Sequence, residues 1–194
     1  KLPDTYAIAL NIGPYELLKA DYSSRFGNTI PLRFWYLKGQ KTKAEGLFSE
    51  FSTMLDFFEE TIGPYPFADE KMGVVQTPYL GMEHQSSVTY GNQFKNGYLG
   101  RDISESGWGL KFDFIIIHES GHEWFANNIT YKDVADMWIH ESFTSYSESL
   151  FVEYYFGKEA GAEYVLGVRN NISNDRPIIG SYNVNKRGST DMYN

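Results

Sequence analysis

The spacing of apolar residues predicts strands in the first half of the chain. Residues 5–10 (TYAIAL), 30–37 (IPLRFWYL) and 72–76 (MGVVQ) are short runs rich in β-branched or aromatic residues. Turn residues such as glycine, proline and asparagine lie near their ends, a pattern typical of β-strands. Residues 81–91 predict a further strand or a loop at the edge of a sheet.

Apolar residues recur at helical spacing through much of the second half of the chain and in one segment of the first half. Over residues 41–62, large apolar residues recur every three or four positions until Gly63 and Pro64 end the pattern. A polar, glycine-rich loop is predicted over residues 92–109. Three helices are then predicted, at 112–128, 134–156 and 158–173, before an irregular end at 174–194. Strands followed by helices predict an α+β domain.

One of these predicted helices carries the motif His-Glu-Ser-Gly-His at 118–122. Helix positions i and i+4 lie on one face, so His118 and His122 can face the same ion. Glu119 lies at the edge of that face, which suits a general base. Eighteen residues separate His122 from Glu141, which the next helix would return to the ion as a third ligand. We therefore predict one Zn²⁺ per chain, held between two helices, for metal-assisted hydrolysis of a peptide bond.

Asn128 and His140 limit the class of metallopeptidase and the set of possible metal ligands. A metzincin would carry a third histidine where this chain has Asn128, so that class is excluded. His140 adjoins Glu141 and on a helix would point about 100° away from it. We therefore do not expect His140 to bind the metal.

Composition limits the possible partners and chemistry. The net charge of −8 argues against a nucleic-acid partner, which requires a basic face. The absence of cysteine excludes disulfides and thiol catalysis. No apolar run approaches about 18 residues, so no transmembrane helix is expected. The chain begins and ends within a pattern, and we expect it to be a piece of a longer protein.

Several segments together resemble the aminopeptidase N family of zinc metallopeptidases, which are gluzincins and include leukotriene hydrolase. In family order, they are GPYPF at 63–67, GMEH at 81–84, HESGHEWFANNIT at 118–130, WIHESFTSYSE at 138–148 and Met192-Tyr193. The resemblance implies a thermolysin-like catalytic domain over residues 21–194, truncated at its carboxyl end. Residues 1–20 would then be the tail of an amino-terminal β domain.

The resemblance also implies a substrate-binding loop. In the family, the segment corresponding to GMEH forms the exopeptidase loop, and its glutamate holds the free α-amine of the substrate. Gly81, Met82 and Glu83 are therefore expected to bind substrate. A carboxylate suits this role because it pairs with an ammonium group. His84 stands where the family usually has asparagine, which leaves the detailed contacts of the loop open.

Two further roles follow from the resemblance. Tyr193 corresponds to the family's catalytic tyrosine, which donates a hydrogen bond to the oxyanion of the tetrahedral intermediate. Only Tyr193-Asn194 of the family's Tyr-x-Lys-Gly motif is present, and Tyr182 is the alternative. Glu148 matches an acidic family position, where it either supports a metal ligand or lies on a solvated helix face.

The function implied is a zinc aminopeptidase that removes amino-terminal residues from peptides, with Glu119 as the base. Two alternatives stay open: a catalytically silent or binding member of the family, and an endopeptidase or epoxide hydrolase on the same scaffold. The expected partners are peptides with a free amino terminus and the rest of the parent chain. The composition is typical of an exported bacterial protein, and whether this piece is active by itself stays open.

Overall fold

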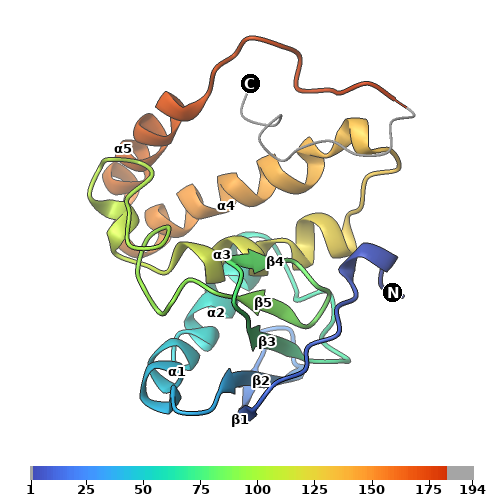
Figure 1. Ribbon diagram of the computed structural model, residues 1–194. Coiled ribbons are helices and arrows are strands. Elements are labelled where there is room, and N and C mark those ends of the chain that lie inside the picture. The colour runs from blue at the N-terminus through green and yellow to red at the C-terminus, as the bar shows by residue number, and fades with distance from the viewer. Residues whose placement is uncertain (1, 183–194) are drawn as a thin grey trace.

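A five-stranded mixed sheet forms the lower part of the molecule in Figure 1. The computed structural model describes residues 2–182. In the order β1-β2-β3-β5-β4, β1 and β2 are antiparallel, β2, β3 and β5 are parallel, and β4 returns antiparallel to β5. The strands are β1 (Tyr15–Ser23), β2 (Thr29–Leu37), β3 (Met72–Gln76), β4 (Gly81–Met82) and β5 (Val88–Tyr90). The short strand β4 therefore lies at an edge of the sheet.

The structure confirms two predicted strands and corrects a third. β2 and β3 match the runs at 30–37 and 72–76. The strand predicted at 5–10 is wrong, because Thr5–Ala7 form a 3₁₀ turn, η1, and the residues that follow do not join the sheet. Instead β1, which the spacing did not predict, pairs along its full length with β2. The expected domain boundary at residue 20 lies within β1.

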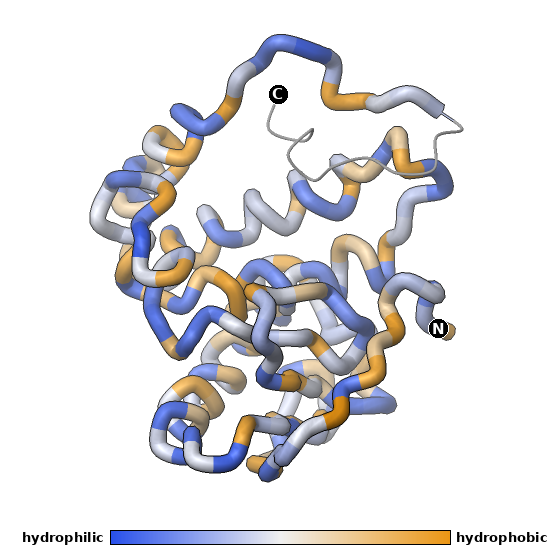
Figure 2. The backbone as a smooth tube through the Cα atoms, viewed as in Figure 1, coloured by the Kyte–Doolittle hydropathy of each residue, from blue (hydrophilic) through white to orange (hydrophobic). Residues whose placement is uncertain are grey.

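The segment between η1 and β1 exposes a row of apolar side chains. Ile8, Leu10 and Ile12 are 63%, 86% and 85% exposed. Alternate residues of this segment are apolar, which predicts a strand locally. Among the described residues no sheet partner buries them, so the alternation does not lead to a strand. Figure 2 shows the hydrophobic colouring of the segment that leads from the amino terminus toward the sheet.

The helices α3, α4 and α5 lie above the sheet in Figure 1, with α1 and α2 beside it. The α-helices are α1 (Lys41–Phe48), α2 (Phe51–Thr61), α3 (Phe114–Gly121), α4 (Trp138–Phe156) and α5 (Lys158–Val168). Shorter helical turns are η2 (Trp108–Leu110), η3 (Glu123–Asn128), η4 (Val134–Asp136) and η5 (Arg169–Asn171). Together they give the predicted α+β architecture. Within residues 2–182, no helix is both long and apolar enough to cross a membrane.

Two predicted helices are interrupted in the structure. The helix expected over 41–62 divides at Ser49, whose hydroxyl donates to the Gly46 carbonyl at 2.6 Å. The Glu50 amide bonds to Leu47 instead, which ends α1. A single helix is expected over 112–128, but α3 ends at Gly121 and the wider π-type turn η3 follows it.

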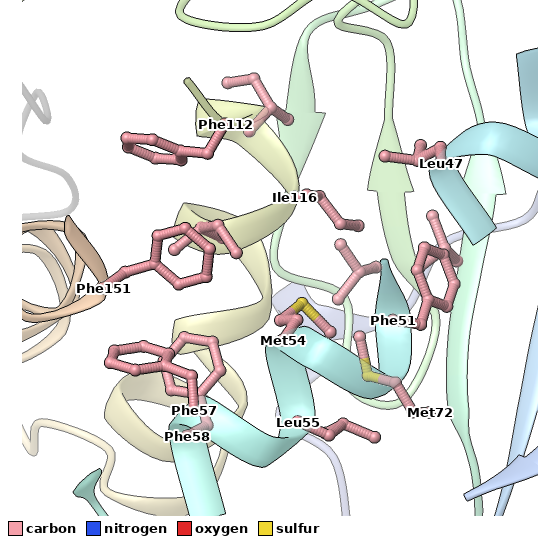
Figure 3. Close-up of a cluster of buried hydrophobic side chains, with 14 of the residues drawn as sticks. Leu47, Phe51, Met54, Leu55, Phe57, Phe58, Met72, Phe112, Ile116 and Phe151 are labelled. Carbon is pink, nitrogen blue, oxygen red and sulfur yellow. The ribbon is translucent and has the colours of Figure 1, made fainter. Parts of the chain in front are cut away.

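The core joins α2 to the sheet and to the two helices above it (Figure 3). The α2 side chains Phe51, Met54, Leu55, Phe57 and Phe58 are almost completely buried. They meet Ile116 of α3 and Phe151 of α4, and fully burying each such side chain contributes about 1.5–3 kcal/mol. This packing fixes α3 and α4 relative to each other.

Candidate metal site

Asp113 fixes the start of α3. Its carboxylate accepts hydrogen bonds from the amides of Ile115 and Ile116 at 3.0 and 3.3 Å, which caps the helix. The same carboxylate accepts from Tyr90 at 2.5 Å and from Asn92 at 2.8 Å. Since Tyr90 ends β5, the helix with the two histidines is anchored to the sheet.

Three donor atoms converge between α3 and α4. Nε2 of His118 and Nε2 of His122 lie 3.2 Å apart. Oε2 of Glu141 lies 3.6 Å from the first nitrogen and 3.7 Å from the second. Donor atoms about 2.0–2.1 Å from a tetrahedral ion are separated by about 3.3 Å. The triangle thus has the size and donor types of a zinc site.

Hydrogen bonds on the outer side of each imidazole determine which nitrogen faces the triangle. Nδ1 of His118 lies 2.7 Å from Oε1 of Glu148, to which it donates. Nδ1 of His122 donates to the Phe125 carbonyl at 3.1 Å. With Nδ1 bonded outward, each ring turns its Nε2 toward the triangle. Glu148 is buried, so it does not lie on a solvated helix face, and it contacts the candidate ligand His118.

The charged groups of His118, Glu141 and Glu148 shift one another's pKa values. Burial disfavours the charged form of His118, but its bonds to Glu141 and Glu148 raise its pKa well above the usual value. Burial would raise the pKa of Glu141, but the two histidines lower it to about 2. Glu141 is therefore an anion at neutral pH, as a metal ligand must be.

Glu119 and Glu83 lie beside the triangle. Oxygens of both carboxylates lie within 4.8 Å of each other and of a His122 nitrogen. Burial and the charge of Glu83 raise the pKa of Glu119 to about 8, although the charge of His118 opposes them. A carboxyl with a pKa near neutral can both accept and return a proton.

The loop residues before Glu83 are placed differently. Gly81 leaves room for Glu119, since a Cβ there would lie 2.5 Å from Oε1 of Glu119. Met82 is half-buried in β4, opposite Thr89 of β5. His84 is buried, and its Nδ1 lies 3.4 Å from the Thr89 hydroxyl. The imidazole of His84 is therefore packed inside the protein, against β5.

Tyr182 and His140 do not join this cluster. Tyr193 lies outside the described residues. Tyr182 is exposed and donates to Asp136 at 3.4 Å, and no bond joins it to the three candidate ligands. His140 accepts from the Tyr131 amide at 3.1 Å and stacks on that ring, which agrees with its exclusion as a ligand.

Sequence reasoning missed two residues near the site. Glu123 is completely buried immediately after His122. Tyr6 stacks on His140 with ring centroids 6.4 Å apart, and burial followed by the charge of Glu83 raises its pKa. Neither carries a sequence signal, because a glutamate beside a motif and a tyrosine in an apolar run usually have ordinary roles.

A cavity of about 540 Å³ lies on the α4 side of the triangle. Glu141 and Glu148 form part of its wall. Much of the remainder is apolar, from the residues Ile103, Phe114, Val165, Val168, Ile172 and Ile178. It could accept an apolar side chain next to the candidate metal site.

Comparison with known proteins identifies the family. Residues 48–187 match the peptidase family M1 domain. The chain belongs to this family.

Two relatives and one solved structure agree with this family assignment. Aminopeptidase N of Streptomyces lividans is 26% identical over 149 residues, which cover 75% of this chain and 17% of that protein. Glutamyl aminopeptidase of Bos taurus is 30% identical over 138 residues, covering 69% and 14%. A crystal structure of a mutant M1 zinc metallopeptidase from Deinococcus radiodurans, bound to a Tyr-Ser-Ala substrate, is similar with a TM-score of 0.57 and 28% identity. It covers 77% of this chain and 31% of that one. The chain thus spans less than a fifth of either curated relative.

Proposed function

We propose that this chain carries the catalytic centre of a zinc-dependent aminopeptidase. The observation that supports this most is the triangle formed by His118, His122 and Glu141, with Glu119 and Glu83 beside it. Membership of peptidase family M1 and the aminopeptidase relatives agree with it. The three donors would hold Zn²⁺, which when bound polarises a carbonyl and lowers the pKa of water.

Glu119 would act as the general base. Its carboxylate takes a proton from the attacking water and returns it to the amine that leaves. This carboxyl group is buried and lies beside the candidate ligand His122, within reach of a water in the site. The close approach of Gly81 holds the carboxylate on the metal side of β4.

Glu83 would set exopeptidase specificity. Its largely buried carboxylate pairs with the α-ammonium group of the substrate, so cleavage falls after the first residue. We further propose that Tyr193 donates a hydrogen bond to the oxyanion as the carbonyl becomes tetrahedral. The cavity beside Glu141 would take an apolar side chain of the substrate.

The proposal is tested with aminoacyl-anilides on the full-length protein. The expected result is hydrolysis of the free-amine substrate and none of its N-acetylated counterpart. Equal rates on both would refute the aminopeptidase and favour an endopeptidase. Glu119→Gln should keep its zinc and lose activity by at least about a hundredfold.

Metal analysis separates the enzyme from a silent or binding member of the family. The native protein should contain one zinc per chain, and His122→Ala should lose it. His140→Ala is the matched control, because His140 adjoins a ligand without facing the metal site. A native protein without zinc would favour the silent member.

A further inference from the structure

Glu123 is a buried carboxylate surrounded by hydrogen-bond donors. It is 0% exposed. Its Oε1 accepts from the Ser86 amide at 3.0 Å and from the side-chain amide of Asn127 at 2.9 Å. Its Oε2 accepts from the Tyr65 hydroxyl at 2.6 Å. Hydrogen bonds to a carboxylate are stronger than those between neutral groups, so this cluster is a firm attachment point.

Glu123 and Asn127 attach the loop that carries Glu83 to η3. Asn127, already bonded to Glu123, also donates to the Glu83 carbonyl at 2.8 Å. Glu123 itself binds the other end of the loop at Ser86. The loop is therefore held at both ends by η3, the turn directly after His122.

The loop has little freedom to settle elsewhere. Ser86 has a φ of 49°, in the left-handed region that non-glycine residues rarely adopt. Its carbonyl lies so close to β3 that a Cβ on Gly73 would be 2.5 Å away. The bonds from the Ser86 amide to the buried Glu123 carboxyl group offset the cost of this conformation.

The position of this loop sets the distance between two carboxyl groups of the proposed site. Oxygens of Glu83 and Glu119 lie within 4.8 Å of each other. Displacement of the loop away from α3 would widen this separation. The attachment through Glu123 opposes that displacement without covering the Glu83 carboxylate.

We propose that Glu123 is a positioning residue for the amino terminus of the substrate. It fixes the distance from Glu83 to the metal-binding helix, so that the amine site is formed before substrate arrives. This inference rests on the proposed role of Glu83. Glu123 belongs to neither candidate set of metal ligands, and its carboxyl group faces Ser86, Asn127 and Tyr65 instead.

A double-mutant cycle separates positioning from general stability. Glu123→Gln leaves one acceptor and places an NH₂ group among donors. We expect kcat/KM on a free-amine anilide to fall about tenfold to a hundredfold, mainly through KM, with zinc content retained. In a Glu83→Gln background, the same change should cost less than about threefold. Dipeptide affinity, measured by calorimetry in a Glu119→Gln background, should fall by the same factor as kcat/KM.

Glu59 provides the matched control. It is also buried and accepts from Ser24, Tyr22 and the Tyr65 amide, so none of these bonds reaches the Glu83 loop directly. Glu59→Gln should change kcat/KM by the same factor with or without Glu83.

The kinetic results either support or refute the positioning role of Glu123. If Glu123→Gln costs the same factor in both backgrounds, or nothing, positioning is refuted. If Glu83→Gln alone leaves kcat/KM unchanged, the proposed role of Glu83 fails and this inference fails with it. Should Glu123→Gln not fold, Tyr65→Phe removes one donor and must show the same dependence on Glu83, at a smaller size.

Discussion

Gly81→Ala would test how closely β4 controls the proposed base. A Cβ at this position would lie 2.5 Å from Oε1 of Glu119 and 2.9 Å from its Cδ and Cγ. Gly81 is not among the positive-φ residues, so its backbone conformation accepts alanine. The atoms in conflict belong to the end of a flexible side chain. The carboxylate of Glu119, rather than the fold, should therefore move.

The size of the effect follows from that displacement. To reach ordinary contact, the carboxylate must move by about 1 Å. A misplacement of about 1 Å at a reacting group costs about a hundredfold in rate. We expect kcat to fall by about that factor, with zinc content unchanged. The free energy of unfolding should change by less than about 1 kcal/mol, since alanine is itself favoured over glycine in a strand.

Steady-state kinetics and urea unfolding measure the two quantities separately. The control is Gly46→Ala in α1, where a Cβ would have no atom within 4 Å. It should stabilise the protein by up to about 1 kcal/mol and leave kcat unchanged. A Gly81→Ala enzyme with the original kcat would refute the reasoning. A large loss of stability would also contradict it, by showing that the backbone moves instead.

Three further substitutions test the supports of the site. Glu148→Gln should weaken zinc binding by about tenfold to a hundredfold in a chelator competition, whereas Glu153→Gln, exposed on the same helix, should not. Asp113→Ala should lower the free energy of unfolding by about 1–3 kcal/mol in urea, and a change under 0.5 kcal/mol (roughly the error of such data) would contradict its capping role. Phe58→Ala, which removes a fully buried ring stacked on Trp124, should cost about 3–5 kcal/mol in the same assay, and a loss below about 1 kcal/mol would contradict its place in the core.

The candidate metal site could be predicted from the sequence because it depends on local periodicity. The i and i+4 spacing of His118 and His122 is a property of any α-helix, and one antiparallel helix returns Glu141 to it. The supporting contacts depend on tertiary packing instead. Whether a glutamate such as Glu123 is solvated or buried depends on residues dozens of positions away, including Tyr65.

The same distinction explains the errors in the fold. The runs that form β2 and β3 are rich in apolar residues, so burial inside a sheet stabilises them whatever the order of the strands. By contrast, TYAIAL has strand-like alternation but no partner in the sheet, and β1 is a strand because β2 pairs with it. Helix ends depended on single side-chain bonds, such as that from Ser49 to Gly46, which periodicity does not register.

The exposed row formed by Ile8, Leu10 and Ile12 affects how this stretch of chain behaves outside its native surroundings. Large apolar side chains exposed in a row offer a surface for contact between molecules. Self-association at high protein concentration is therefore expected to begin here rather than at the acidic surface elsewhere. The net charge of −8 keeps molecules apart over long distances but is screened beyond about 8 Å at physiological salt. Colloidal behaviour would then depend on ionic strength, since added salt weakens the repulsion and leaves the apolar contact intact.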